Sequence, residues 1–488
     1  MDVPVSNVSY KQLHEEFMSG LNGSSLVEVS VLTLIPVGST LVRDLFCLFV
    51  NDFTQPWLIV VNVMIIIVPL LLSFTVLNFT DFTVLVSLFT TAAGMLGLIA
   101  ARHSQSRKTQ QSKSGSLLET FLDLEMSSRR PFISYFRGQT LLATAVAILA
   151  VDFTIFPRRF AKTETYGTGL MDTGVGLFVV VNAVVSPEAR GKVTTKSPVL
   201  AVMQAVKSSM PLVVIGALRL LAVKNIDYQE HVSEYGVHWN FFLTLAAVKV
   251  LSAVILSVFP VHLSGLLSII IAAGYQYSLT ATSLTHYILH GADGRGTRGG
   301  FLDANREGLF SCIGYLAIYF AGVEIGSYIF RKRRRVRDWM LVLCVFVSMS
   351  LLSWIVLGIV SNTVEPVSRR LANGPFCIWT VALSFLLLTV NLAGDIAVTC
   401  AQSLCPRDGR ESKTFPEDLS TTCLLSAINY NSLLYFLVAN LLTGLVNMSL
   451  QTLYAPPSLA ITIITGYMLV LSGLVMLLYR KKISTKFW

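Results

Sequence analysis

The chain has 488 residues, of which 53% are hydrophobic and only 13% are charged, with a mean hydropathy of +0.65. A soluble globular protein carries about 25% charged residues, so this composition excludes soluble, disordered and disulfide-rich secreted proteins. The seven cysteines include no Cys-x-x-Cys pair, which argues against both a zinc site and a disulfide framework. The apolar residues come in runs of about 20, long enough to cross roughly 30 Å of hydrocarbon. The sequence predicts an all-α, polytopic transmembrane helical bundle.

Windows of about 20 apolar residues predict about 13 membrane-spanning helices. The first five lie near residues 27–49, 57–77, 82–101, 139–151 and 171–185. The next five lie near 199–223, 239–259, 263–282, 309–330 and 339–360, and the last three near 376–401, 432–454 and 458–479. The fourth and fifth are shorter than a full span, which allows extension, tilting or partial re-entry. We therefore expect a multi-spanning domain over 27–479, an N-terminal segment over 1–26 and a tail over 480–488.

The loop cations predict the orientation. Of the 37 Lys and Arg residues, 24 fall in one set of loops and 10 in the opposite set. The richer set is cytoplasmic by the positive-inside rule, so we expect a lumenal N-terminus and a cytoplasmic C-terminus. Glycosylation sequons at Asn7 and Asn22 then face a compartment in which they can be used. Sequons at Asn78 and Asn447 sit close to predicted helix ends.

The cations on the far side are informative because the positive-inside rule does not require them. Most of them gather in three polar loops, at 152–172, 228–240 and 286–307. All three loops face one compartment, so together they can line a single cavity.

In the first loop, Asp152 closes an apolar run, and Arg158, Arg159 and Lys162 follow within eleven residues. A carboxylate at the hydrocarbon boundary is costly unless a cation or a hydrogen-bond donor meets it. One interpretation is a set of snorkelling charges that fix the helix ends. The other is chemistry: a carboxylate with a raised pKa acting as general base on a hydroxyl, and a Lys that polarises a carbonyl or neutralises an oxyanion.

The other two loops are more ambiguous. His238 stands beside Trp239 and Asn240 at the predicted membrane edge, where an aromatic residue is expected in any case. The third loop is rich in glycine and contains Arg295 and Arg298, so its backbone amides and guanidinium groups can cradle a phosphate; a flexible turn explains the glycines equally well. The histidines are spaced too widely for a zinc site. These residues alone allow either an enzyme that acts on lipids or a transporter.

Two stretches of the first loop, 156–164 (FPRRFAKTE) and 166–176 (YGTGLMDTGVG), closely resemble the glycosylphosphatidylinositol (GPI) inositol acyltransferases, the PIG-W family. The similarity recurs at 228–231, 235–242, 303–308, 367–373 and the closing 487–488, so it spans nearly the whole chain. The resemblance implies an endoplasmic reticulum membrane enzyme. Such an enzyme moves a fatty acyl group, usually palmitoyl, from acyl-CoA to the 2-hydroxyl of inositol in glucosaminyl-phosphatidylinositol.

The resemblance also assigns expected roles. Asp152 is expected to deprotonate the inositol hydroxyl and Lys162 to orient the thioester carbonyl or offset oxyanion charge, with His238 as the alternative base. The substrate-binding candidates are Arg158, Arg159, Glu164, Asp172, Trp239, Asn240, Asn305 and Arg306. The expected partners are acyl-CoA as co-substrate, the glycolipid and membrane lipids, with no cofactor, metal or nucleic acid; protein partners stay open. The alternatives are a lipid or small-solute transporter and a structural subunit of a biosynthetic complex.

Overall fold

The computed structural model describes residues 10–17, 19–50, 55–77, 80–109, 117–192, 197–225, 232–405 and 419–485. Twelve helical segments in this part of the chain are long and apolar enough to cross a membrane, and a thirteenth apolar helix is shorter. The same residues form isolated β-bridges but no β-strand. The predicted all-α bundle of about 13 spans is therefore confirmed.

The long helices follow the predicted order with adjusted ends. They are α2 (Leu26–Phe49), the continuous segment α3 (Gln55–Asn62), η1 (Val63–Ile67) and α4 (Val68–Phe74), α5 (Asp81–Thr109), α7 (Pro131–Ala150), α9 (Pro198–Asn225), α11 (Phe241–Val258), α12 (Ser264–Ala281), α15 (Arg306–Ile329), α16 (Val336–Thr363), α17 (Gly374–Leu404), α19 (Ser432–Ser449) and α20 (Pro457–Arg480). The shorter ones are α1 (Tyr10–Phe17), α6 (Leu117–Leu122), α8 (Thr173–Ala183), α10 (Val232–Tyr235), α13 (Leu284–His290), α14 (Gly300–Ala304) and α18 (Leu424–Tyr430).

The two short predicted spans have different outcomes. The fourth becomes the full-length α7 because the helix begins at Pro131, eight residues before the predicted start, with the proline in its favoured first-turn position. Its added first turns bury Phe132 and Phe136. The fifth remains short: α8 has 11 helical residues and continues into turns through Arg190.

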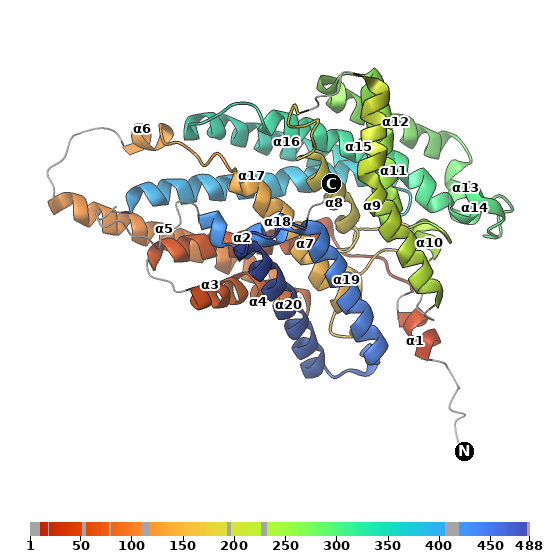
Figure 1. The fold of residues 1–488 in the computed structure, drawn as a ribbon, viewed down its shortest axis with the longest axis horizontal. Coiled ribbons are helices and arrows are strands. Elements are labelled where there is room, and N and C mark those ends of the chain that lie inside the picture. Colours follow the sequence, from red (N-terminus) through yellow and green to blue (C-terminus); the bar gives the residue numbers. More distant parts are fainter. Residues whose placement is uncertain are drawn as a thin grey trace, which may run out of the picture.

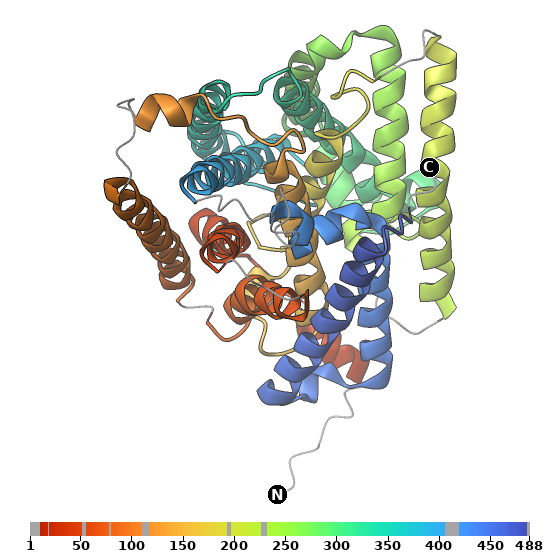
Figure 2. The ribbon, with the colours of Figure 1, turned by 60° about the vertical axis from the view of Figure 1, so that its left-hand side comes forward.

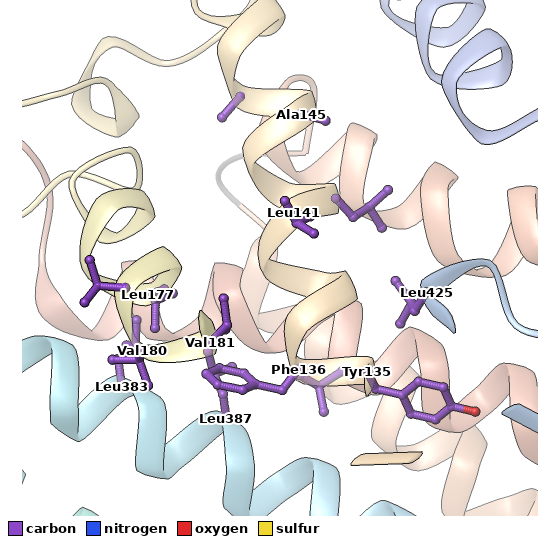
Figure 3. Packing of buried hydrophobic residues seen from close by; sticks show 14 of the residues in the cluster. Tyr135, Phe136, Leu141, Ala145, Leu177, Val180, Val181, Leu383, Leu387 and Leu425 are labelled. Carbon is purple, nitrogen blue, oxygen red and sulfur yellow. The ribbon is translucent and has the colours of Figure 1, made fainter. Parts of the chain in front are cut away.

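The core lies where α7, α8, α17 and α18 meet. Figure 3 shows the Phe136 ring of α7 beside Val181 of α8 and Leu387 of α17, all fully or almost fully buried. The flanks differ: α5 and α9 lie on opposite sides of the bundle, with α11 beside α9 (Figure 2), and most side chains of α9 are exposed, as expected for a helix that faces lipid.

Small residues let α8 approach α15. A Cβ atom at Gly322 would lie 2.6 Å from the Cβ of Ala183, and one at Gly326 would lie 2.3 Å from the backbone oxygen of Val184. Helices in lipid associate through this kind of close backbone contact, since burial of apolar surface provides little drive there. The contact fixes the short α8 and hence the polar loop that precedes it.

The polar loops gather at one end of the bundle. The short helices α10, α13 and α14 lie together at that end, and α6 lies at the other (Figure 1). Since α7 has 20 residues and a helix rises about 1.5 Å per residue, its two ends are roughly 30 Å apart. The loop that follows α7 is therefore a full span away from the turn that precedes it.

Candidate active site

Four segments interlock at the end of the bundle that holds Asp152. The Val237 amide donates to the Ala304 carbonyl over 2.9 Å, which joins the second polar loop to the third. The Gly167 amide donates to the Val367 carbonyl over 2.9 Å, which joins the first loop to the turn before α17. The three loops therefore lie together as predicted, and residues 365–373 form a fourth element of the site.

A closed network of charges surrounds Lys162. Its Nζ atom lies 2.8 Å from Oε1 of Glu234, which in turn lies 3.5 Å from Nη2 of Arg369. The Nε atom of Arg369 donates to Oδ1 of Asp172 over 2.7 Å, and the Asp172 carboxylate accepts from the Thr163 amide, directly after Lys162. The network thus holds both the ammonium group and the backbone that carries it.

Burial differs steeply along this network. Asp172 and Arg369 are at most 3% exposed, the Glu234 side chain is 17% exposed and that of Lys162 is 40% exposed. Burial raises the pKa of Asp172, and the Arg369 guanidinium and the amides of Gly169 and Thr163 oppose this by stabilising the carboxylate. The buried end is therefore structural support, and Lys162 is the member that can meet a substrate.

Asp152 lies just beyond the end of α7 and is 4% exposed. Its Oδ2 atom accepts from Nδ2 of Asn447 over 2.7 Å, so the last turn of α19 orients the carboxylate. Burial lowers the pKa of Arg158 to about 10. The negative charge of Asp152 is close enough to oppose this shift. The carboxylate thus has both the donor and the cation that its position requires.

Arg158 and Arg159 both stabilise the loop. Arg158 Nη2 donates to the Val151 carbonyl over 2.7 Å, and its guanidinium carbon lies 3.9 Å from the ring centroid of Phe17. Arg159 pairs with Glu28 of α2 over 2.9 Å, with both side chains about one-third exposed or less. Arg159 is 30% exposed in this partly exposed salt bridge, so an anion can reach it.

The candidates of the second and third loops mostly hold the backbone. Asn240 caps α11 by accepting from the Phe242 and Leu243 amides, and Trp239 Nε1 donates to Thr244 over 2.9 Å. The buried Asn305 accepts from the His238 amide over 2.7 Å, while His238 itself is exposed. Gly236, with a φ of +107°, permits this approach, because a Cβ atom there would lie 2.5 Å from the Cα of Asn305. These contacts fix the backbone of the second and third loops around the site.

Arg306 is also committed to structure. It is 1% exposed and donates to the carbonyls of Ile288, Thr297 and Asp303 at 3.0 Å each, which fixes the glycine-rich loop. Beside it, Glu307 accepts from Arg298 over 2.8 Å and from Arg370 over 3.0 Å.

The remaining candidates lie at the surface. Glu164 is exposed and accepts from the Gly20 amide over 2.6 Å. Asn22 is exposed next to the same loop, whereas Asn7 and Asn78 fall outside the described residues, as does His231. Within the described ranges, no group of three or more His, Cys, Asp or Glu side chains is placed to hold a metal ion.

Two members of the Lys162 network, Glu234 and Arg369, were not among the candidates from sequence. Arg369 is one of the far-side cations that the positive-inside rule does not require, and this excess was the available signal. The pairing itself joins residues 135 positions apart, a relationship that no local pattern contains.

The GWT1 family model matches residues 10–478 of the chain. The chain belongs to the GWT1 family. It is 40% identical to the bovine (Bos taurus) protein named glucosaminyl-phosphatidylinositol-acyltransferase PIGW, over 99% of this chain and 100% of that protein. It is 38% identical to the human (Homo sapiens) protein of the same name, with the same coverage.

More distant members of the GWT1 family are also similar along their whole length. The yeast Yarrowia lipolytica protein named GPI-anchored wall transfer protein 1 is 35% identical over 98% of this chain and 99% of its own length. The four interlocked segments of the site all fall within the region that the GWT1 family model matches.

Proposed function

We propose that this protein is an acyltransferase that acylates the inositol of glucosaminyl-phosphatidylinositol, a step in GPI-anchor biosynthesis. The similarity to relatives named for this activity supports the proposal, because it covers 99% of the chain and so includes every polar loop of the site. The multi-spanning fold is consistent with a lipid substrate that stays in the bilayer. Nothing among the matched proteins favours a transporter.

The proposed donor is a fatty acyl-CoA, with palmitoyl as the expected chain. The 2-hydroxyl oxygen of inositol attacks the thioester carbonyl carbon, and the hydroxyl proton passes to a base. The tetrahedral oxyanion collapses, the carbon–sulfur bond breaks, and CoA leaves as a thiolate that takes up a proton. The products are an inositol ester and free CoA, so the reaction requires no redox or metal cofactor.

Asp152 is the proposed base and Lys162 the proposed oxyanion stabiliser. The hydrogen bond from Asn447 fixes the orientation of the Asp152 carboxylate, and a carboxylate held in one orientation suits proton abstraction. The Lys162 ammonium is held by Glu234 yet is 40% exposed, so it can approach a developing negative charge. Arg159, Arg158 and Glu164 are proposed to contact the phosphate or sugar, while Asp172, Trp239, Asn240, Asn305 and Arg306 support them. His238 is the alternative base.

The proposed location is the endoplasmic reticulum membrane, with the Asp152 end of the bundle in the lumen. The loop cations support this orientation, since 24 of them lie on the other side against 10 on this one. The N-terminus is then lumenal and the C-terminus cytoplasmic.

The proposal is tested by following both products with purified protein, mass-labelled palmitoyl-CoA and glucosaminyl-phosphatidylinositol. We expect one molecule of free CoA for each molecule of label that enters the lipid, and no label in lipid when glucosaminyl-phosphatidylinositol is omitted. CoA release without labelled lipid would show a thioesterase, and movement of unmodified lipid between leaflets would show a transporter.

A further inference from the structure

Three arginines converge at the end of the bundle opposite to Asp152. Arg130 immediately precedes α7, Arg190 lies in the turns that follow α8, and Arg333 lies between α15 and α16. These segments are far apart in the chain. Each of the three side chains contacts an aromatic ring at the C-terminal end of α15, which is the ring of Phe330 or of Tyr328. We call these three residues the arginine cluster.

The rings hold the cluster together. The guanidinium carbons of Arg130 and Arg190 lie 4.8 Å and 5.3 Å from the centroid of the Phe330 ring. Arg130 and Arg333 share the Trp339 ring at 5.6 Å and 5.9 Å. Arg130 thus touches both rings and stands between the other two cations. Cation–π contacts of this kind orient guanidinium groups. Nη1 of Arg333 also donates to the Tyr328 carbonyl over 2.6 Å and Nη2 of Arg130 donates to the Arg331 carbonyl over 3.3 Å. A guanidinium has five N–H donors, so each of these two keeps others for a ligand.

The cluster carries positive charge without a matching carboxylate. Among the described residues, none of its members forms a salt bridge, although Arg335 and Arg337 nearby both pair with Asp123. Burial and the neighbouring charges of Arg333 and Arg190 lower the pKa of Arg130. Arg130 also has a φ of +51°, in the left-handed region that non-glycine residues rarely adopt. Its half-buried position is therefore maintained against both electrostatic and backbone cost.

The positive-inside rule explains why cations occur at this end, but not why three separate segments bring them onto two shared rings. Lys332 and Arg334 in the same turn are exposed, which is the arrangement that topology alone requires. Arg190 is also exposed, but its guanidinium carbon lies 5.3 Å from the centroid of the Phe330 ring. An anion with several oxygens would compensate the cluster, because planar guanidinium forks bind phosphate oxygens in pairs.

We propose that the arginine cluster is a binding site for a phosphate ester at the membrane surface opposite to Asp152. The ester is either the headgroup of an anionic phospholipid in that leaflet or a phosphate of CoA. The site lies roughly 30 Å from Asp152 along α7, so it is separate from the proposed catalytic loops. It does not depend on the proposed acyl transfer.

The test uses full-length protein purified in neutral detergent and titrated with phosphatidylinositol, phosphatidylcholine or free CoA under native mass spectrometry. We expect phosphatidylinositol or CoA to bind at least about tenfold more tightly than phosphatidylcholine, because the first two carry net negative charge whereas the choline group of phosphatidylcholine neutralises its phosphate. Because both probes resemble the proposed substrates, only binding that the arginine-cluster variants weaken is assigned to the cluster. Such a preference for phosphatidylinositol identifies a headgroup site, and such a preference for CoA identifies a nucleotide site. Equal binding of all three probes would overturn the proposal.

Double variants test whether binding depends on the arginine cluster itself or only on the total positive charge of this end of the bundle. Arg130→Gln/Arg333→Gln should weaken binding of the preferred probe by about tenfold or more, while Lys332→Gln/Arg334→Gln removes the same charge and should change it by less than about threefold. Arg130→Lys/Arg333→Lys keeps the charge but loses the planar forks, and we expect intermediate binding. If the first pair misfolds, the lysine pair decides alone: unchanged binding there would contradict the site, as would equal losses in the two glutamine pairs.

Discussion

Arg369 donates from Nε to Oδ1 of Asp172 over 2.7 Å, and neither side chain is more than 3% exposed. This pair joins the turn before α17 to the N-terminus of α8, two segments 197 residues apart. Since Asp172 also accepts from the Thr163 amide, the pair fixes the loop on which Lys162 stands.

Replacement of Arg369 by leucine should strongly destabilise the protein. The change leaves the Asp172 carboxylate buried without its cation, which costs about 3–5 kcal/mol in typical cases. The matched control is Arg159→Leu, whose salt bridge with Glu28 is partly exposed and should contribute about 1 kcal/mol or less. Thermal unfolding in detergent measures both, and similar melting temperatures for the two variants would contradict the buried role of Arg369.

Replacement of Glu234 by glutamine should lower turnover by about tenfold, because Lys162 loses the carboxylate that positions its ammonium group near the oxyanion. Lys162→Ala should lower turnover further. If Glu234 acts only through Lys162, the Glu234→Gln change should have almost no effect in the Lys162→Ala background. Asp123→Asn, at the other end of the bundle, is the control for expression and purification. Additive losses in the double variant would exclude a positioning role.

Replacement of Asp152 by asparagine keeps the shape of the side chain and removes the base. Turnover should fall by at least about a hundredfold, the usual scale for loss of general-base catalysis. The comparison requires variants matched for monodisperse protein in detergent, since a folding defect also removes activity. Near wild-type turnover would exclude Asp152 as the base and make His238 the next residue to test.

Replacement of Gly326 by leucine should separate α8 from α15. Its side chain would collide with the Val184 backbone oxygen, which lies 2.3 Å from the Cβ position, and overpacking of this kind costs about 1–3 kcal/mol. Gly358→Leu is the matched control, because Gly358 is exposed on α16 and no neighbouring atom lies within 4 Å of its Cβ position. Equal thermal stability of the two variants would show that the close approach is unimportant.

Asn22 should be glycosylated and Asn447 should not. Asn22 is exposed beside the Asp152 loop, whereas the Asn447 side chain is half-buried and donates to Asp152. Endoglycosidase treatment of microsomal protein should increase its mobility, and Asn22→Gln should remove most of that shift. A second test introduces a sequon between α6 and α7, at the end of the bundle opposite to Asp152. A glycan there would place that end in the lumen and reverse the proposed orientation.

The sequence predicted the spans well because each long apolar run reports its own helix. It misplaced the start of α7 because the polar residues Ser134 and Arg137 lower the hydropathy of the first turns, although α7 is buried in protein there. It did not predict α18, whose buried residues Leu424, Leu425 and Ile428 form a helix too short to register as a span.

The site was predictable only in part. The sequence indicated the loop that carries Asp152 and Lys162, because it places several charged residues at the predicted membrane edge. The resemblance to a known family indicated the same residues. Glu234 and Arg369 did not, because their importance lies in pairing across distant segments. The support roles of Asn240 and Asn305 likewise depend on caps and backbone contacts that appear only in three dimensions.

The most direct measurement is the fragment mass spectrum of glucosaminyl-phosphatidylinositol after incubation of the purified protein with palmitoyl-CoA. We predict a headgroup fragment in which the inositol ring carries one additional palmitoyl group, formed by wild-type protein and lost in Asp152→Asn. A headgroup fragment of unchanged mass, with the acyl group elsewhere or absent, would contradict it.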